Sequence, residues 1–247
     1  MDAPADPVED VDRPWERRSA ARTAVVWEAL RPRLDTKGLR IVDIGGGTGG
    51  FAVRIAELGH EVTVIDPSPD ALAAADRRAA ERGVSDRVHG VQGDLTDLGQ
   101  LVAPAGADLV LCHDVLGLLD DPADGMRTIA AALPSGGCLS LLVGQRHAAV
   151  LAAATIAQFD RARDLLVGAP TRPHLFDVDE CAAMVGAAGF TVDAVHGVRV
   201  FTDLVPSSLV DGEAGASAAL LELERVAATR PEYLTMATQL HVLATRG

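Results

Sequence analysis

Hydrophobic positions along this chain fall into two alternating patterns. Short apolar runs that end at a turn residue or an acid are typical of buried strands. They occupy residues 39–45, 61–68, 88–94, 107–119 and 136–145. Between them, apolar residues recur at helical spacing, and several of these segments close on a glycine. They predict helices at residues 49–59, 69–83, 96–102, 122–133 and 177–189.

Strands and helices that alternate in this way require right-handed crossovers and a doubly wound parallel sheet. Two further strand patterns close the chain at residues 190–201 and 239–245, which makes seven strands in all. We therefore expect an α/β fold with a Rossmann-like, mostly parallel sheet. Ligands of such sheets bind beyond the carboxyl ends of the strands.

The remaining chain divides into a tail, a cap and two insertions. Residues 1–12 carry five acids, no base and two prolines, which predicts a disordered acidic tail. Apolar residues at helical spacing predict an N-terminal helical cap over residues 13–38. We expect a helical insertion at residues 146–175 and a loop of small residues at 204–217, all within one domain over residues 13–247.

Charge narrows the partners that the protein can attract. The net charge is −13 and the isoelectric point is near 4.8, which disfavours general attachment to nucleic acid or an anionic membrane. Residues 13–40 reverse this balance with eight basic and three acidic residues. This basic stretch is either a solvated helix face or a local contact for RNA.

Cysteine usage and the first residues bear on the compartment. Cys112, Cys138 and Cys181 lie far apart without CxxC spacing, so they indicate neither a disulfide framework nor a zinc site. No other metal site is predicted. The N-terminal stretch lacks the pattern of a secretory signal, and no apolar run reaches the roughly 18 residues of a membrane span. We expect a cytoplasmic protein.

The stretch VDIGGGTGG follows the first predicted strand and fits two glycine patterns. Gly45, Gly47 and Gly50 match the spacing of a dinucleotide-binding loop. Asp43 followed by glycines up to Gly49 matches the loop of S-adenosylmethionine sites. An acid at this strand end is unfavourable beside a pyrophosphate, whereas S-adenosylmethionine has no phosphate and carries a sulfonium and an ammonium group. Asp43 therefore favours S-adenosylmethionine.

Two acids after the next strands extend this pattern. Asp66 ends the second strand, where its carboxylate can accept hydrogen bonds from both ribose hydroxyls of either cofactor. Asp94 ends the third strand and is placed to accept from an adenine amino group, a position that a dinucleotide leaves unused. Each acid alone could be a helix cap or turn residue. Together with the glycines they predict an S-adenosylmethionine site.

Short motifs along most of the chain carry a family resemblance. They are R-x-A-x-x-W at 22–27, D-x-GGG at 43–47, GVSD at 83–86, H-x-VL at 113–116, GG-x-LSL at 136–141, GVRVF at 197–201 and LLELE at 220–224. With them the chain resembles class I S-adenosylmethionine-dependent methyltransferases, and among these the bacterial tRNA carboxymethoxyuridine methyltransferases, which esterify a modified wobble uridine. The resemblance implies a terminal antiparallel strand hairpin and a tRNA partner for the basic stretch. It implies cofactor contacts from Arg22, Gly45, Gly46, Asp66, Asp94, Leu95 and His113.

The chemistry of methyl transfer suggests further candidates near the acceptor. A carboxylate acceptor is ionised at neutral pH and needs no base, whereas a hydroxyl would need one, with His113 or His147 as candidates. Arg199 is a candidate to bind an acceptor carboxylate or phosphate, and equally a surface ion pair. No Asn-Pro-Pro-Tyr motif for amino-group methylation follows the fourth strand. Oxygen methylation is therefore favoured.

Two departures from the family leave the acceptor open. Gly117 and Leu118 stand where family members carry an acid and an aromatic residue, and GAPTRPHLF at 168–176 replaces a lysine-rich stretch. Small-molecule, glycan and lipid-precursor acceptors are therefore alternatives to tRNA. An NAD(P)-binding oxidoreductase leaves Asp43 and Asp94 unexplained, and a non-catalytic binding module has no need of the intact loop. The oligomeric state is not predicted.

Overall fold

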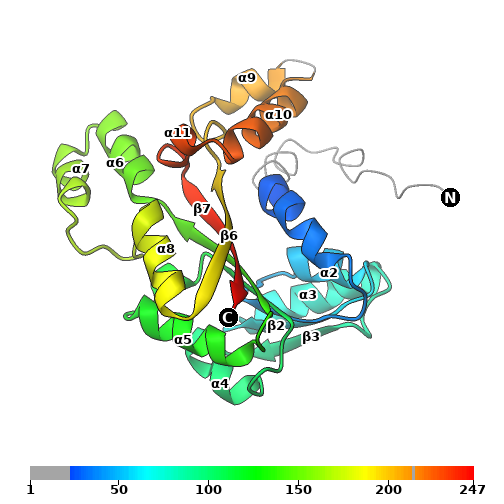
Figure 1. Cartoon of the computed structure of the whole chain (residues 1–247). Coiled ribbons are helices and arrows are strands. Elements are labelled where there is room, and N and C mark those ends of the chain that lie inside the picture. The colour runs from blue at the N-terminus through cyan, green and yellow to red at the C-terminus, as the bar shows by residue number, and fades with distance from the viewer. Residues whose placement is uncertain (1–22, 213–214) are drawn as a thin grey trace.

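A computed structural model describes residues 23–212 and 215–247 of the chain (Figure 1). One sheet of seven strands runs through it in the order β3-β2-β1-β4-β5-β7-β6. The strands are β1 (Arg40–Ile44), β2 (Glu61–Asp66), β3 (Val88–Gln92), β4 (Leu109–His113), β5 (Cys138–Gly144), β6 (Phe190–Val198) and β7 (Gln239–Arg246). Only β7 is antiparallel to its neighbours, β5 and β6. The predicted doubly wound α/β fold with an antiparallel terminal pair is confirmed.

Helices cover both faces of this sheet. One face carries the helix at residues 23–30, α2 (Gly50–Ala56) and α3 (Pro69–Glu81). The other face carries α4 (Leu98–Leu101), α5 (Pro122–Ala132) and α8 (Val178–Ala187). Short 3-10 turns complete the layers as η2 (Arg31–Leu34), η3 (Leu95–Asp97) and η4 (Leu116–Leu118).

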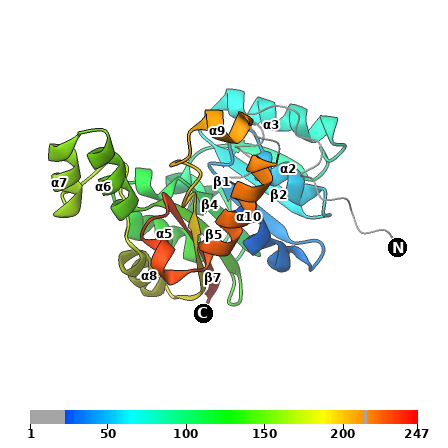
Figure 2. The same cartoon turned by 90° about the horizontal axis from the view of Figure 1, so that it is seen from above.

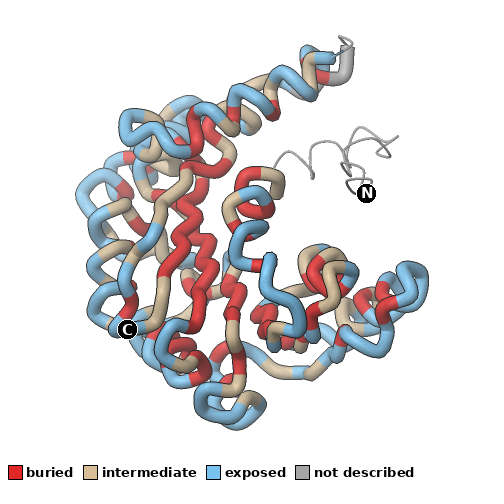
Figure 3. Tube along the Cα trace, turned by 45° about the vertical axis from the view of Figure 1, so that its right-hand side comes forward, coloured by how far each residue is buried: buried red, intermediate tan, exposed pale blue. Residues whose placement is uncertain are grey.

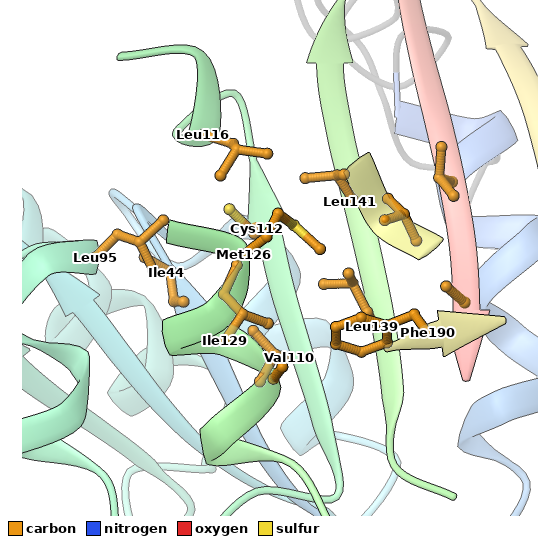
Figure 4. Packing of buried hydrophobic residues seen from close by; sticks show 14 of the residues in the cluster. Ile44, Leu95, Val110, Cys112, Leu116, Met126, Ile129, Leu139, Leu141 and Phe190 are labelled. Atoms are coloured by element: carbon orange, nitrogen blue, oxygen red, sulfur yellow. The ribbon is translucent and has the colours of Figure 1, made fainter. Parts of the chain in front are cut away.

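The hydrophobic core lies on both faces of the central strands, where Figure 3 shows most of the buried chain. Figure 4 shows Met126 and Ile129 of α5 packed toward Val110 and Cys112 of β4 and Leu139 of β5, all fully buried. Burying each such side chain contributes about 1.5–3 kcal/mol. Because the central strands are buried on both faces, their sequences are almost continuously apolar.

Five helices of the described chain lie beyond the carboxyl edge of the parallel strands (Figures 1 and 2). They are α6 (Arg146–Thr155), α7 (Phe159–Leu166), α9 (Ser207–Gly212), α10 (Ala216–Ala228) and α11 (Pro231–Leu234). The predicted loop at 204–217 is therefore wrong, because α9 and the start of α10 occupy it. In this segment Val210 is buried and α9 contacts α10.

Some expectations fall on residues that the structure does not describe. The predicted tail at residues 1–12 lies outside the described residues, and so does Arg22. Of the predicted cap, residues 23–38 are described and contain the helix at 23–30 and η2. In the described ranges no helix combines the length and the apolar character that crossing a membrane requires.

Candidate active site

The turn after β1 has a backbone that requires glycines. Gly45, Gly47 and Gly49 have φ angles of 69°, 55° and 74°, a region that other residues rarely adopt. The amide of Gly45 donates to the carbonyl of Ile65 in β2 at 2.7 Å. A Cβ on Gly45 would collide with Val115, which follows β4. The turn is thus fitted between the ends of β1, β2 and β4.

Asp43 lies directly under this turn. Its side chain is buried, and a Cβ on Gly46 would lie 2.6 Å from its Oδ2, so Gly46 lets the backbone pass close over the carboxyl group. Burial and the nearby charge of Asp66 raise the pKa of Asp43 to about 7. In its ionised form this carboxyl group favours a cationic ligand above the turn and disfavours a phosphate.

Asp66 connects the glycine turn to the start of α3. Its Oδ2 accepts from the amide of Gly47 and its Oδ1 from the amide of Ser68, each at 2.9 Å. Each carboxylate oxygen has a further lone pair, so both can still accept from a ligand hydroxyl. Ser68 caps α3 by accepting from the amide of Ala71. Strand end, turn and helix start therefore form one hydrogen-bonded unit.

Asp94 and Leu95 follow β3 on the same edge. Oδ1 of the exposed Asp94 accepts from the amide of Thr96 at 2.7 Å and from its hydroxyl at 2.5 Å. These bonds lower the pKa of Asp94, which keeps it ionised. The side chain of Leu95 is completely buried in the core. A ligand can therefore reach Leu95 only through its main chain.

His113 ends β4 with its ring half-buried beside α2. Its ring meets Phe51 edge-on at a centroid distance of 5.1 Å. Its Nε2 lies 2.9 Å from Oγ of Ser140, which in turn lies 2.8 Å from Nε2 of His241. Burial lowers the pKa of His113 to about 4, so the ring is neutral at physiological pH and is a weak base.

A polar cluster at this edge joins the ends of β4 and β6 to the start of β7. Arg199 follows β6, with a φ angle of 61°, and its Nη2 pairs with Asp203 at 2.5 Å. Its Nη1 makes a longer bond of 3.4 Å to Oε1 of Gln239. The amide of Gln239 donates to both carboxylate oxygens of Asp114, at 2.6 and 2.8 Å. Since Asp114 directly follows His113, this cluster links Arg199 to the end of β4.

A buried carboxylate from α10 holds the turn that carries Arg199. Glu224 accepts from the amides of Val200, Phe201 and Thr202 at 2.9, 2.9 and 2.7 Å, and from the hydroxyl of Thr202 at 2.6 Å. The side chain is 1% exposed. The motifs GVRVF and LLELE, which are distant in sequence, therefore form a single contact.

His147, a predicted site residue, and its neighbour Arg146 contact other groups than this polar cluster. His147 is exposed on α6, with its Nδ1 3.4 Å from the amide nitrogen of Gln145. Arg146 is paired with Glu180 at 2.6 Å, at the start of α8. Across the described residues, no three His, Cys, Asp or Glu side chains are placed to hold a metal ion.

The sequence interpretation missed five polar residues that lie at this edge or within the strands behind it. Asp114 adjoins the H-x-VL histidine, and Ser140 and Glu224 lie within quoted motifs, so their positions were visible but their contacts were not. Gln239 and His241, which lies two residues further on, belong to no motif in the sequence. Their place follows only from the pairing of β7 with β5 and β6.

Comparisons with known proteins agree with this geometry. A family model described as a methyltransferase domain matches residues 42–139. The tRNA 5-carboxymethoxyuridine methyltransferase of Escherichia coli K12 is 31% identical over 231 residues, which cover 90% of this chain and 87% of that protein. A ubiquinone biosynthesis O-methyltransferase of Xanthomonas euvesicatoria is 30% identical, over 76% of this chain and 77% of that protein.

Solved structures show the same fold. An S-adenosylmethionine-dependent methyltransferase from Mesorhizobium loti superposes with a TM-score of 0.63 at 24% identity, covering 92% of this chain and all of that one. Magnesium protoporphyrin IX methyltransferase from Synechocystis, solved with bound S-adenosylhomocysteine, gives a TM-score of 0.61 at 16% identity, over 100% of this chain and 90% of that one. The chain belongs to the class I S-adenosylmethionine-dependent methyltransferases.

Proposed function

We propose that the cofactor lies across the carboxyl ends of β1, β2 and β3. The glycine turn at residues 45–49 would approach its methionyl part, Asp66 would accept from the ribose hydroxyls and Asp94 from the adenine amino group. Leu95 would contribute its main chain, and Arg22 is proposed to pair with the methionyl carboxylate. Bound S-adenosylmethionine supplies the electrophilic methyl group, so the chain's own task is to position the acceptor.

We propose further that the acceptor is a carboxylate oxygen held by Arg199. The guanidinium stands at the carboxyl edge with its side chain 23% exposed. Its Nη2 already pairs with Asp203, but its buried Nε has no acceptor among the described residues. A charged donor in that state favours an anionic ligand. A carboxylate needs no base, which suits an edge whose half-buried histidine is a weak base.

Carboxymethoxyuridine of tRNA is the carboxylate acceptor that the similarity supports best. The relative named for that substrate matches over 90% of this chain. The basic stretch at 13–40 is the proposed RNA contact, although two of its described arginines already have acidic partners: Arg33 pairs with Asp193 at 2.6 Å and Arg40 with Asp108 at 2.9 Å. Arg31 and Lys37 are exposed in the same stretch.

A small-molecule hydroxyl is the second candidate acceptor. The similarity to ubiquinone biosynthesis O-methyltransferases favours it, and so do the large apolar side chains exposed on α7 and just after it, with Phe159 69% and Val167 73% exposed. Asp114, whose pKa is raised by burial, and His147 are the groups that could take the hydroxyl proton.

Mass spectrometry of tRNA nucleosides from cells with and without the gene distinguishes the two candidates. The proposal expects a uridine methyl ester that disappears on deletion and returns with the wild-type gene. Complementation with Arg199→Gln should fail. Arg127→Gln, an exposed arginine of α5 paired with Asp124 at 2.8 Å, should restore the ester. An unchanged nucleoside profile on deletion would rule out tRNA as the acceptor.

A further inference from the structure

A row of four polar side chains, two of them fully buried, crosses the sheet from His113. Ser140 of β5 lies between two rings, with its Oγ 2.9 Å from Nε2 of His113 and 2.8 Å from Nε2 of His241. The ring of His196 on β6 stacks on His241 at a centroid distance of 5.4 Å. Ser140 and His241 are fully buried. Polar groups within apolar strands are costly unless they are hydrogen-bonded, so the position of each proton matters.

Counting protons limits the arrangements of this row. A serine hydroxyl has one proton and a neutral imidazole has one N–H. Ser140 can therefore donate to one histidine while it accepts from the other. If both rings donated to it, its own proton would be buried without an acceptor among the described residues. Two arrangements remain, and each places one ring proton on an Nδ1 and the other on an Nε2.

The two outer nitrogens of the row decide between them. Nδ1 of His241 is buried and has no partner in the described chain, whereas Nδ1 of the half-buried His113 is the open end of the row. If Ser140 donated to His241, that ring would carry a buried N–H without an acceptor. If Ser140 donates to His113 instead, Nδ1 of His241 has only an unused lone pair. Buried N–H groups without an acceptor are rarer in proteins than buried lone pairs without a donor.

We propose that Ser140 donates to Nε2 of His113 and thereby fixes His113 as the Nδ1–H tautomer, with that proton facing the ligand. His113 is then a hydrogen-bond donor instead of a base, and Ser140 and His241 are positioning residues. The inference rests on the proposed function in placing His113 beside the ligand. It deepens that proposal, because a donor suits an acceptor oxygen that is already ionised, such as a carboxylate.

Nitrogen-15 NMR of the histidine rings in the free, full-length protein tests the tautomer directly. His113→Gln and His241→Gln assign the two rings. The proposal expects the proton of His113 on Nδ1 and that of His241 on Nε2. A proton on Nε2 of His113 overturns it. Because neither cofactor nor acceptor is present, a wrong acceptor assignment leaves this result untouched, and the two proposals fail separately.

Substitutions of Ser140 and His113 add a second measurement. Ser140→Ala removes the inner partner of His113, so the signal of a single tautomer should become a mixture, whereas Ser140→Thr keeps the hydroxyl and should keep the tautomer. An asparagine amide occupies the place of Nδ1 and a glutamine amide that of Nε2. His113→Asn should therefore retain at least tenfold more methyl transfer than His113→Gln. The opposite order contradicts the proposal, and the wild-type spectrum alone decides if the Ser140 variants do not fold.

Discussion

The half of the molecule that we propose holds the cofactor, β1 to β3 with their turns (the cofactor half), is built from local contacts. The half that we propose holds the acceptor, β5 to β7 with the edge helices (the acceptor half), is built from distant ones. The bond from Gly47 to Asp66 spans 19 residues, while the bond from Gln239 to Asp114 spans 125. The cofactor half buries its acid Asp43, and the acceptor half exposes large apolar side chains such as Phe159.

Because their contacts differ in this way, the two halves can change independently. The glycine turn, Asp43 and Asp66 hold one another through backbone contacts that leave little freedom for substitution. The polar cluster depends on the side chains of Arg199 and Gln239, which can be exchanged without altering the glycine turn. Cofactor binding and acceptor recognition should therefore respond to different mutations.

The largest expected effect is on the cofactor half, from Gly46→Ala. The new Cβ would overlap the buried carboxyl of Asp43, 2.6 Å from Oδ2, so the turn must move. We expect S-adenosylhomocysteine to bind at least about 100-fold more weakly by calorimetry. Gly50→Ala is the matched control, because its Cβ would lie an ordinary 3.5 Å from Arg78. An equal loss of binding in the control would contradict the overlap with Asp43 as the specific cause.

Glu224→Ala removes the buried carboxylate that accepts from the amides after Arg199 in the acceptor half. The amides of Val200, Phe201 and Thr202 lose their acceptor. We expect this to lower the free energy of unfolding by about 2–3 kcal/mol in urea titrations. Glu222→Ala removes an exposed carboxylate of the same helix, paired with Arg225 at 3.4 Å, and should change stability by less than about 0.5 kcal/mol. Equal losses of stability in Glu224→Ala and Glu222→Ala would contradict this role of Glu224.

Arg199→Gln sharpens the division of tasks between the halves. Without the guanidinium the acceptor loses its proposed charged partner, so methyl transfer should fall about 30-fold, in line with one charge-assisted contact of roughly 2 kcal/mol. Radiolabelled methyl transfer to tRNA measures this. The control is Arg127→Gln, which should transfer methyl groups at the rate of the wild type.

The smallest expected effect is the pH dependence that Asp43 gives to stability. Its pKa is raised from 3.8 to about 7 on folding, so the folded state keeps a proton that the unfolded chain has released. Stability from this group is therefore lost as the pH rises from about 4 to about 7, and is level above that. Between about pH 5 and pH 7 the loss should be on the order of 2 kcal/mol. Urea titrations of Asp43→Asn should lack it, and a slope equal to that of the wild type would contradict the shift.

The same contrast explains what could be predicted from the sequence. Strand runs, crossovers and the order of Asp43, the glycines and Asp66 are local signals, and the α/β fold and the cofactor class followed from them. The contacts of Gln239 and His241 depend on β7 entering the sheet between β5 and β6, which no periodicity expresses. The loop expected at 204–217 is partly helical, because α9 and the start of α10 lie within it. There α9 contacts α10 and buries Val210, a tertiary contact that local composition does not express.

The separation of the two halves is tested most directly by titrating S-adenosylhomocysteine into three proteins by calorimetry: the wild type, Asp66→Ala and Arg199→Gln. Asp66 is hydrogen-bonded to the glycine turn, and Arg199 lies in the polar cluster with Asp203 and Gln239. We predict that Asp66→Ala abolishes measurable binding and that Arg199→Gln binds within about twofold of the wild type. Unchanged affinity in Asp66→Ala, or an equal loss in both variants, would contradict the account.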